Sequence, residues 1–151
     1  VQLLAASFHA LVSLGVLLLA QMVLGPAIPW TALFLPLVDL PLLLLTLGLA
    51  WLLASLGVFV RDIAQGMGLL TSVLLFTAPV FFPLHALPVA LQPWLQLNPL
   101  TFIIEQTRAV LIWGQLPNVG GLALYSLCAL VVAMLGFAWF QKTRKGFADV
   151  L

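Results

Sequence analysis

The chain has 151 residues, of which 64% are hydrophobic and 6% are charged, and its formal net charge is +1. A soluble domain usually has about 25% charged residues, so this composition is that of an integral membrane protein. A net charge so close to zero does not indicate nucleic acid as a partner. The length leaves no room for a soluble catalytic domain beside the apolar segments.

Four long apolar segments make up most of the chain: residues 3–24, 32–60, 63–82 and 119–140. Crossing a bilayer core takes roughly 20 apolar residues at a rise of about 1.5 Å each. The sequence therefore predicts an all-α integral membrane protein with four transmembrane helices. Residues 83–118 form a long loop between the last two spans, and residues 141–151 form a tail.

The ends and the single cysteine give little further information. The chain begins at Val1 without a Met or a basic n-region, and its first apolar segment is longer than a typical signal-peptide core. We therefore expect no cleaved signal peptide, and we expect that the N-terminal part of a longer protein is missing. Cys128 is alone, so no internal disulfide is possible.

The distribution of basic residues predicts the orientation. If all four segments cross, most of the Lys and Arg side chains share one face: Arg61, Lys142, Arg144 and Lys145. The opposite face has only Arg108. The positive-inside rule then places the C-terminus in the cytoplasm and the loop 83–118 outside.

Polar residues within the first three segments allow more than one interpretation. His9 can be a proton relay or ligand site, although a histidine bonded to a neighbouring helix is the interpretation we favour. Asp39 is a functional hypothesis because a charge within a span is expensive. We favour a structural role, in which Asp39 caps a helix starting at Leu40. Asp62 followed by Gln65 resembles a capping box at the start of the third span.

Small residues recur at spacings that permit close approach of helices. They are Gly66 and Gly68 in the third segment, and the pairs Ala50/Ala54 and Ala129/Ala133. In a chain so rich in Ala and Leu, this pattern is a weak signal.

The loop 83–118 contains a predicted short helix. Prolines interrupt its first part, and Asn98-Pro99 then gives an N-cap followed by Pro at the first helical position. The helix should run from Pro99 to Trp113 and stop at Gly114, which is too short to span a membrane.

The short helix has one polar stripe, formed by Thr101, Glu105 and Arg108 at positions i, i+4 and i+7. Its other faces are apolar. Such a helix either lies in the outer interface or dips back into the membrane against other helices. Glu105 and Arg108 are three residues apart and can form an ion pair.

Motifs for nucleotide, metal and acid–base sites are not convincing. Residues 136–143 almost match the phosphate-binding pattern G-x-x-x-x-G-K-[ST], but Gln141 replaces its second glycine and the segment ends an apolar span. His9 and His85 fall on opposite sides of the predicted topology, so no metal site is expected. The four acids are scattered, which does not indicate paired-carboxylate catalysis.

The residues alone leave three hypotheses open. A transporter subunit fits a broken apolar segment, a polar re-entrant helix and the lack of reactive clusters. An intramembrane enzyme, such as a lipid-linked glycosyl or acyl transferase, would use Glu105 or His85. A membrane assembly factor is the third.

The order of unusual residues from 61 to 117 carries a family resemblance. The pattern consists of Arg61-Asp62-Ile63, Pro79-Val-Phe-Phe-Pro83, Leu87-Pro88, Pro93, Asn98-Pro99-Leu100-Thr101, Glu105, Arg108, Gly114 and Pro117, and the chain ends KTRKGFADVL. It resembles the C-terminal half of the permease subunits of type-2 ABC exporters. The resemblance is greatest to those that export O-antigen and other cell-envelope polysaccharides.

This resemblance implies an architecture and a set of partners. The family has six membrane helices, so the four segments would be the last four. The permease would form a homodimer with its channel at the dimer interface in the bacterial cytoplasmic membrane. Separate subunits would bind ATP and Mg, and this chain would have neither a cofactor nor a catalytic residue of its own. The cargo would be a lipid-linked polysaccharide, or in a different type-2 exporter a drug or lipid.

Within this architecture we assign hypothetical roles to individual residues. The outer gate would comprise Asn98, Pro99, Glu105 and Arg108, and the cytoplasmic turn Arg61 and Asp62. Aromatic rings can stack on the C–H faces of sugars, so the substrate path would include Trp51, Phe76, Phe81 and Phe82. The alternative for each ring is ordinary packing against lipid or other helices.

Overall fold

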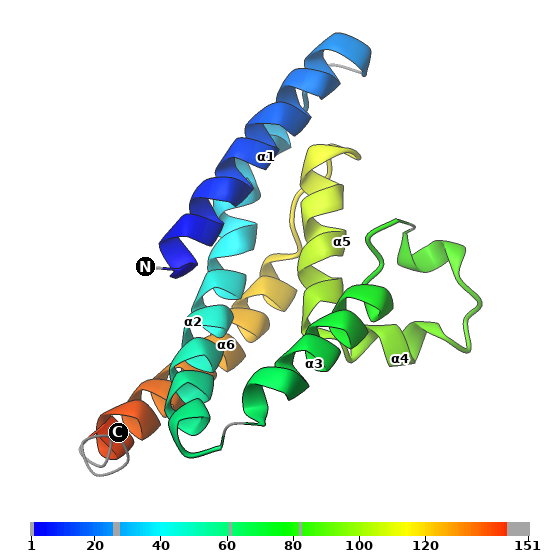
Figure 1. Cartoon of the computed structure of the whole chain (residues 1–151). Helices are drawn as coiled ribbons and strands as arrows, with labels where there is room; N and C mark the ends of the chain where they lie inside the picture. Colours follow the sequence, from blue (N-terminus) through cyan, green and yellow to red (C-terminus); the bar gives the residue numbers. More distant parts are fainter. Residues whose placement is uncertain (1, 26–27, 61, 82, 145–151) are drawn as a thin grey trace.

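The computed structural model describes residues 2–25, 28–60, 62–81 and 83–144, which form helices and no strands (Figure 1). In chain order the elements are α1 (Gln2–Leu24), the 3₁₀ helix η1 (Trp30–Phe34), α2 (Leu35–Phe59), α3 (Ile63–Thr77), the 3₁₀ helix η2 (Leu84–Ala86), α4 (Gln92–Gln96), α5 (Pro99–Leu111) and α6 (Val119–Thr143). The described residues confirm the predicted all-α class.

Three helical stretches are long and apolar enough to cross a membrane: Leu4–Leu24, Trp30–Phe59 and Val119–Thr143. The predicted span 63–82 is only partly helical, because α3 ends at Thr77. Ala78 precedes Pro79 and adopts an extended conformation (φ −80°, ψ 135°), as the steric effect of a following proline favours. By length and composition, the described residues therefore give three candidate spans and one shorter apolar helix.

The predicted cap at Asp39 is wrong. Helix α2 begins at Leu35 with Pro36 in its first turn, so Asp39 lies one turn inside the helix. The 3₁₀ helix η1 leads directly into α2, and Pro36 has a φ suited to a first helical turn. The chain is therefore already helical at Asp39, whose side chain instead faces Thr107 on α5.

The capping box predicted at Asp62 is also wrong. Asp62 occupies the N-cap position of α3, but its side chain makes no capping hydrogen bond. Its backbone angles (φ −70°, ψ −14°) are helical, whereas a capping residue usually has extended angles. The other residue of the predicted turn, Arg61, lies outside the described residues.

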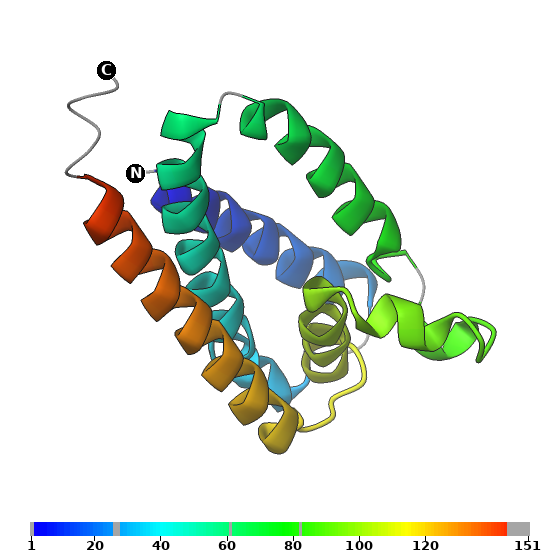
Figure 2. The same ribbon diagram turned by 90° about the horizontal axis from the view of Figure 1, so that it is seen from below.

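Helices α2 and α6 pack at backbone contact (Figures 1 and 2). Gly48 on α2 is buried, and a Cβ atom added there would lie 2.6 Å from both the Cα and the N of Ala133. A Cβ atom on Gly136 would meet the carbonyl oxygen of Gly48. Ala129 and Ala133 are buried in this interface, whereas Ala50 and Ala54 are exposed. Only one of the two predicted alanine pairs therefore lies between helices of this chain.

The buried core lies where α5 meets α2 and α6. Its members are Leu35 and Val38 of α2, Ile103, Val110 and Leu111 of α5, and Leu122 of α6. Helix α1 adds Leu14 and Leu18 to the edge of this core but is otherwise largely exposed. Figure 2 shows α3 diverging from α2 after their turn and approaching the start of α5.

We expect Gly48→Ala to destabilise the helix bundle by about 1–3 kcal/mol, because the new methyl group has no space against the α6 backbone. The measurement is the midpoint of thermal unfolding in detergent. Gly57→Ala is the matched control on the same helix, since nothing lies within 4 Å of its added Cβ. Equal midpoints for the two variants would contradict the close α2–α6 contact.

Candidate functional site

Asn98 joins the end of α3 to the start of α5. Its Oδ1 accepts a hydrogen bond from the backbone N of Leu100 at 2.9 Å, which confirms the predicted N-cap. Its Nδ2 donates to the carbonyl oxygen of Leu74 at 2.8 Å and to Oγ1 of Thr77 at 2.9 Å. Asn98 is only 6% exposed, and Pro99 follows it in the first turn of α5. One amide group therefore serves two helix ends.

The last four carbonyls of any helix lack intrahelical partners, and Leu74 is one of these residues in α3. The path of the chain explains why Asn98 donates this hydrogen bond. The extended backbone at Ala78 ends α3, and the chain returns to the end of α3 where α5 begins. The sequence identified Asn98 as a cap. It gave no signal for the bonds to α3, whose acceptors lie 24 and 21 residues away.

Glu105 and Arg108 form the predicted ion pair, with 2.6 Å between Arg108 Nη1 and Glu105 Oε1. Their side chains are only 18% and 14% exposed. Arg108 Nη2 also donates to the carbonyl oxygens of Pro79 and Val80, at 2.8 and 3.2 Å. The backbone N of Leu84 donates to Glu105 Oε1 at 2.9 Å. The ion pair thus fastens the chain between α3 and η2 to α5, and we call these four contacts the clamp.

Thr101 completes the predicted polar stripe. It is buried, and its hydroxyl donates to the carbonyl oxygen of Leu95 at 2.6 Å. Each polar side chain of the stripe therefore reaches backbone outside α5, in the region between α3 and α5. Hydrogen bonds with an ionised partner are roughly twice as strong as neutral ones, so the clamp is the strongest of these attachments.

The carboxyl end of α5 is held from the opposite side. Thr31 Oγ1 donates to the carbonyl oxygen of Val110 at 2.7 Å, and Gln21 Nε2 donates to that of Leu111 at 3.0 Å. Gly114 then reverses the chain with φ +62°, which agrees with its predicted role as the stop signal. The helix itself ends at Leu111, slightly before the predicted Trp113.

Helix α6 supports the other face of α5. The rings of Phe102 and Tyr125 are stacked, with centroids 5.8 Å apart and an interplanar angle of 18°. Tyr125 also donates its hydroxyl hydrogen to the carbonyl oxygen of Pro99 at 3.0 Å. Gly121 lies against the Phe102 ring, since an added Cβ would be 2.6 Å from Cζ. The position of the Phe102 ring is therefore fixed on several sides.

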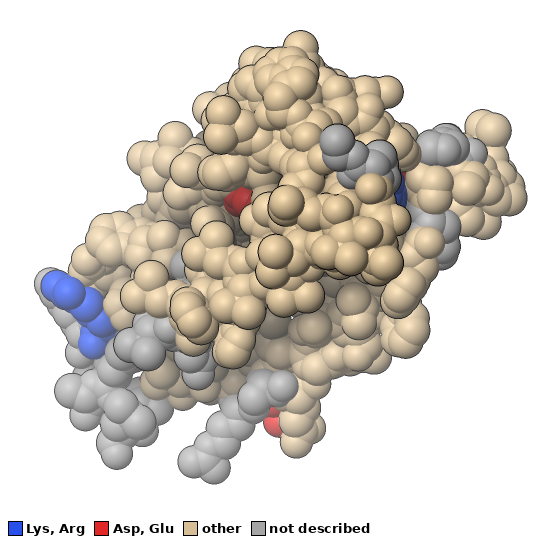
Figure 3. All heavy atoms as spheres, turned by 90° about the horizontal axis from the view of Figure 1, so that it is seen from above, with Lys and Arg blue, Asp and Glu red and all other residues tan. Residues whose placement is uncertain are grey.

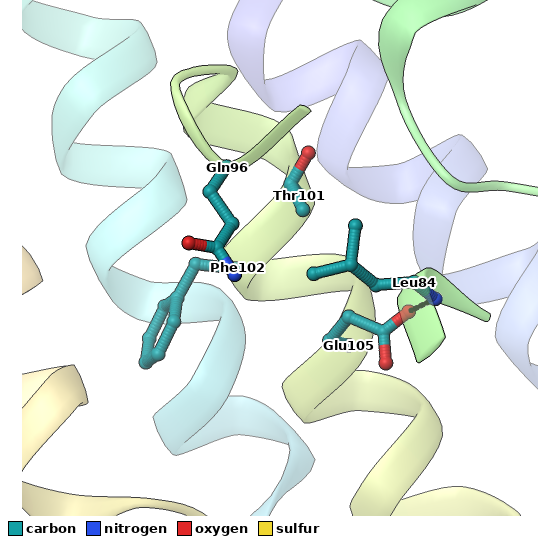
Figure 4. Close-up of a pocket in the computed structure, with 5 residues that line it drawn as sticks. All are labelled: Leu84, Gln96, Thr101, Phe102 and Glu105. Atoms are coloured by element: carbon teal, nitrogen blue, oxygen red, sulfur yellow. Dashed lines mark hydrogen bonds between the residues drawn. The ribbon is translucent and has the colours of Figure 1, made fainter. Parts of the chain in front are cut away.

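A cavity of about 310 Å³ opens beside the clamp (Figure 4). It is lined by Leu84, Gln96, Thr101, Phe102 and Glu105. Glu105 thus belongs both to the clamp and to the cavity wall. In the sequence these residues are dispersed over η2, α4 and α5, so no local pattern could predict the cavity.

The described aromatic residues of the predicted substrate path, Trp51, Phe76 and Phe81, are not gathered in one place. Trp51 lies against Phe137 of α6, with ring centroids 5.0 Å apart, beside an apolar groove of about 280 Å³ between α2 and α6. Phe76 and Phe81 lie at and beyond the end of α3 and are 84% and 94% exposed. Phe82 lies outside the described residues, as does the side chain of His85.

Charge is scarce in this chain, in which 6% of the residues are charged. The face shown in Figure 3 is almost entirely uncharged, with basic atoms near its edges and acidic atoms visible in one hollow and at the lower edge. Residues 136–143, which partly match a phosphate-binding pattern, continue α6 as regular helix. They therefore do not form the strand-to-helix loop that such a pattern requires.

Comparison with known proteins gives a consistent result. Residues 2–112 match the family model described as ABC-2 type transporter. The O-antigen export system permease protein RfbA of Myxococcus xanthus is 27% identical over 139 residues, which cover 91% of this chain and 54% of that protein. The protein of the same name from Klebsiella pneumoniae is 22% identical over 145 residues, covering 95% of this chain and 55% of its own length.

The chain therefore spans about half the length of the curated relatives it matches. No solved structure matches it.

Asn98→Ala should destabilise the protein more than a loss of one cap, which alone costs about 1 kcal/mol. The substitution also removes the Asn98 amide donor from the Leu74 carbonyl, which keeps only the longer 3.4 Å contact from the Thr77 hydroxyl. Asn118→Ala is the matched control, because Asn118 caps α6 through Gly121 N but is exposed. The measurement is the unfolding midpoint in detergent. Asn98→Asp keeps the cap oxygen but replaces the donor with an oxygen beside the Leu74 carbonyl, so it should also destabilise the protein although the cap is retained. Equal decreases in the unfolding midpoint for Asn98→Ala and Asn118→Ala would contradict the role of Asn98 in joining α3 to α5.

Glu105→Gln should reduce stability by about 1.5–3 kcal/mol, because it leaves the shielded Arg108 guanidinium without a counter-charge. The double variant Glu105→Gln/Arg108→Gln removes both charges and should lose less. Arg144→Gln removes an exposed charge at the end of α6 and serves as the control. Unfolding midpoints and the yield of folded protein measure the effect. If the clamp does not contribute to stability, the single and the double variant at positions 105 and 108 will have the unfolding midpoints of the wild type and of Arg144→Gln.

Proposed function

Because the chain belongs to the ABC-2 type transporter family, we propose that it forms the C-terminal half of a permease subunit that exports a lipid-linked polysaccharide. The cargo class is O-antigen, capsule or teichoic acid, and the membrane is the bacterial cytoplasmic membrane. The relatives named O-antigen export permeases support this choice of cargo. A drug or another lipid is the alternative cargo. Membership of a transporter family argues against the intramembrane transferase and the assembly factor.

The proposed complex contains two copies of the permease and separate ATP-binding subunits. ATP and Mg would bind to those subunits. Binding and hydrolysis of ATP there would open and close a path between the two permeases. The near-neutral composition of this chain fits a membrane-embedded partner of such subunits. Lipid and the lipid-linked polysaccharide are its other expected partners.

The proposed topology has four crossings, with the C-terminus in the cytoplasm. Helix α3 has 15 residues, which rise about 22 Å, whereas the hydrocarbon core is about 30 Å thick. The extended backbone after Thr77 would complete the crossing. The polar groups of this non-helical backbone require partners, since such backbone is tolerated at membrane depth only where protein or water satisfies it. The clamp supplies partners to Pro79, Val80 and Leu84.

The clamp is the observation that most supports a gate formed by Asn98, Pro99, Glu105 and Arg108. Helix α5 packs its apolar face into the core, while its polar stripe holds the irregular chain between α3 and η2. This arrangement favours the re-entrant alternative over a helix lying in the outer interface. The gate would then move as one body that includes α5 and the end of α3.

Reconstitution tests the proposed function. Vesicles containing the full-length permease and its ATP-binding subunit should transport lipid-linked polysaccharide when ATP is supplied. Omitting either the ATP-binding subunit or ATP should abolish transport. The measurement is polysaccharide that becomes accessible to a glycosidase on the opposite side of the vesicle membrane. Export by this 151-residue chain alone, or transport of drugs and lipids but not polysaccharide, would overturn the proposal.

A further inference from the structure

We propose that the cavity beside the clamp is a binding subsite for one neutral, hydroxyl-rich sugar ring. The inference rests on the proposed function, because it assigns part of the cargo to a place in the permease. The cavity measures about 310 Å³, near the lower end of the roughly 300–1,000 Å³ typical of small-molecule sites. This size suits one ring rather than several linked sugars.

Uncommitted hydrogen-bonding groups line the cavity (Figure 4). The Gln96 amide is exposed and makes no hydrogen bond with the described residues, so it offers both a donor and an acceptor. The clamp uses Oε1 of Glu105 but leaves Oε2 free of bonds to the part of the chain that is described. The Thr101 hydroxyl is buried and already donates to Leu95, so it is not one of these groups. Neighbouring sugar hydroxyls, which both donate and accept, complement this set.

Apolar groups complete the wall. Leu84 and the Phe102 ring can contact the C–H faces of a sugar, which are its apolar surfaces. Stacking on Tyr125 and the close approach of Gly121 hold the Phe102 ring in place. A wall that is already ordered loses little conformational freedom when a ligand binds, which favours affinity.

Charge selects for a neutral ring. Arg108 already neutralises Glu105, so an amino sugar would gain little from the carboxylate. For the same reason an acidic sugar or a phosphate would gain little from Arg108, because its guanidinium is already turned toward Glu105 Oε1 and the carbonyl oxygens of Pro79 and Val80. The chemistry of the cavity therefore matches hydroxyl groups better than either ion.

The test uses the full-length permease with its ATP-binding subunit in lipid vesicles. Gln96→Cys in a Cys128→Ser background places a thiol in the cavity wall, and Gln115→Cys places one on an exposed glutamine outside it. The rate of modification by an impermeant maleimide is measured with and without methyl glycosides of glucose, galactose, mannose and rhamnose. Sodium glucuronate and glucosamine are the charged comparisons.

We expect at least one neutral glycoside to slow modification at position 96 and not at position 115. Charged sugars should protect position 96 less. In export assays Gln96→Leu should raise the cargo concentration for half-maximal rate about three- to tenfold, the effect of losing one or two hydrogen bonds. Gln115→Leu should leave that concentration unchanged. Both substitutions are on exposed side chains, so folding should not obscure the comparison.

Any of three results would overturn the subsite. The first is that no neutral glycoside in the panel protects position 96, and the second is that charged sugars protect it equally. The third is that Gln96→Leu matches Gln115→Leu in export. If the wild-type complex exports polysaccharide in these experiments, only the subsite fails and the proposed function stands. A wild-type complex that exports no polysaccharide refutes the proposed function, and the labelling result then reports on sugar binding independently.

Discussion

The break after α3 creates backbone polar groups that need partners in an apolar molecule, and the amide of Asn98 supplies one partner on each side of the break. A helix that stops at Thr77 leaves carbonyls without partners, and a helix that starts at Pro99 leaves N–H groups without partners. Asn98 supplies a donor to the first and an acceptor to the second. Asn98 thereby fixes the start of α5, the helix that carries the polar stripe, beside the end of α3.

The contacts of α5 differ in how readily they can change. In lipid, apolar helix faces gain little from one another beyond close packing, so the face formed by Ile103 and Val110 can shift against α2 at a modest cost. Breaking the clamp would instead strand a charged pair and several backbone groups. Any motion of α5 should therefore keep the clamp closed. Helices α2 and α6, locked by Gly48 against Ala133, provide the fixed frame for such a motion.

Local features of the site could be predicted from the sequence, and features that depend on distant partners could not. The N-cap at Asn98, the stop at Gly114 and the Glu105–Arg108 pair involve residues a few positions apart, so propensity and helical spacing sufficed. The donors and acceptors that complete the clamp lie up to 29 residues away. The predicted cap at Asp39 is wrong for a local reason. Aspartate favours N-cap positions, but the 3₁₀ helix η1 leads into α2 before Asp39, so the chain is already helical there. The family resemblance, carried by residues 61–117, agrees with the match over residues 2–112.

Glu105 connects the two proposals made for this region. Its Oε1 holds the clamp through Leu84 and Arg108, whereas its Oε2 makes no hydrogen bond with the described residues, and the side chain also lines the cavity. A hydroxyl group can therefore bind the carboxylate while the clamp stays intact, so recognition of a ring does not require the gate segment to loosen. A ligand that competed for Oε1 would instead weaken the attachment of the chain after α3. In this proposal Glu105 holds the clamp through Oε1 and leaves Oε2 for a hydroxyl group of the cargo. A neutral cargo could therefore bind and be released while the clamp stays intact.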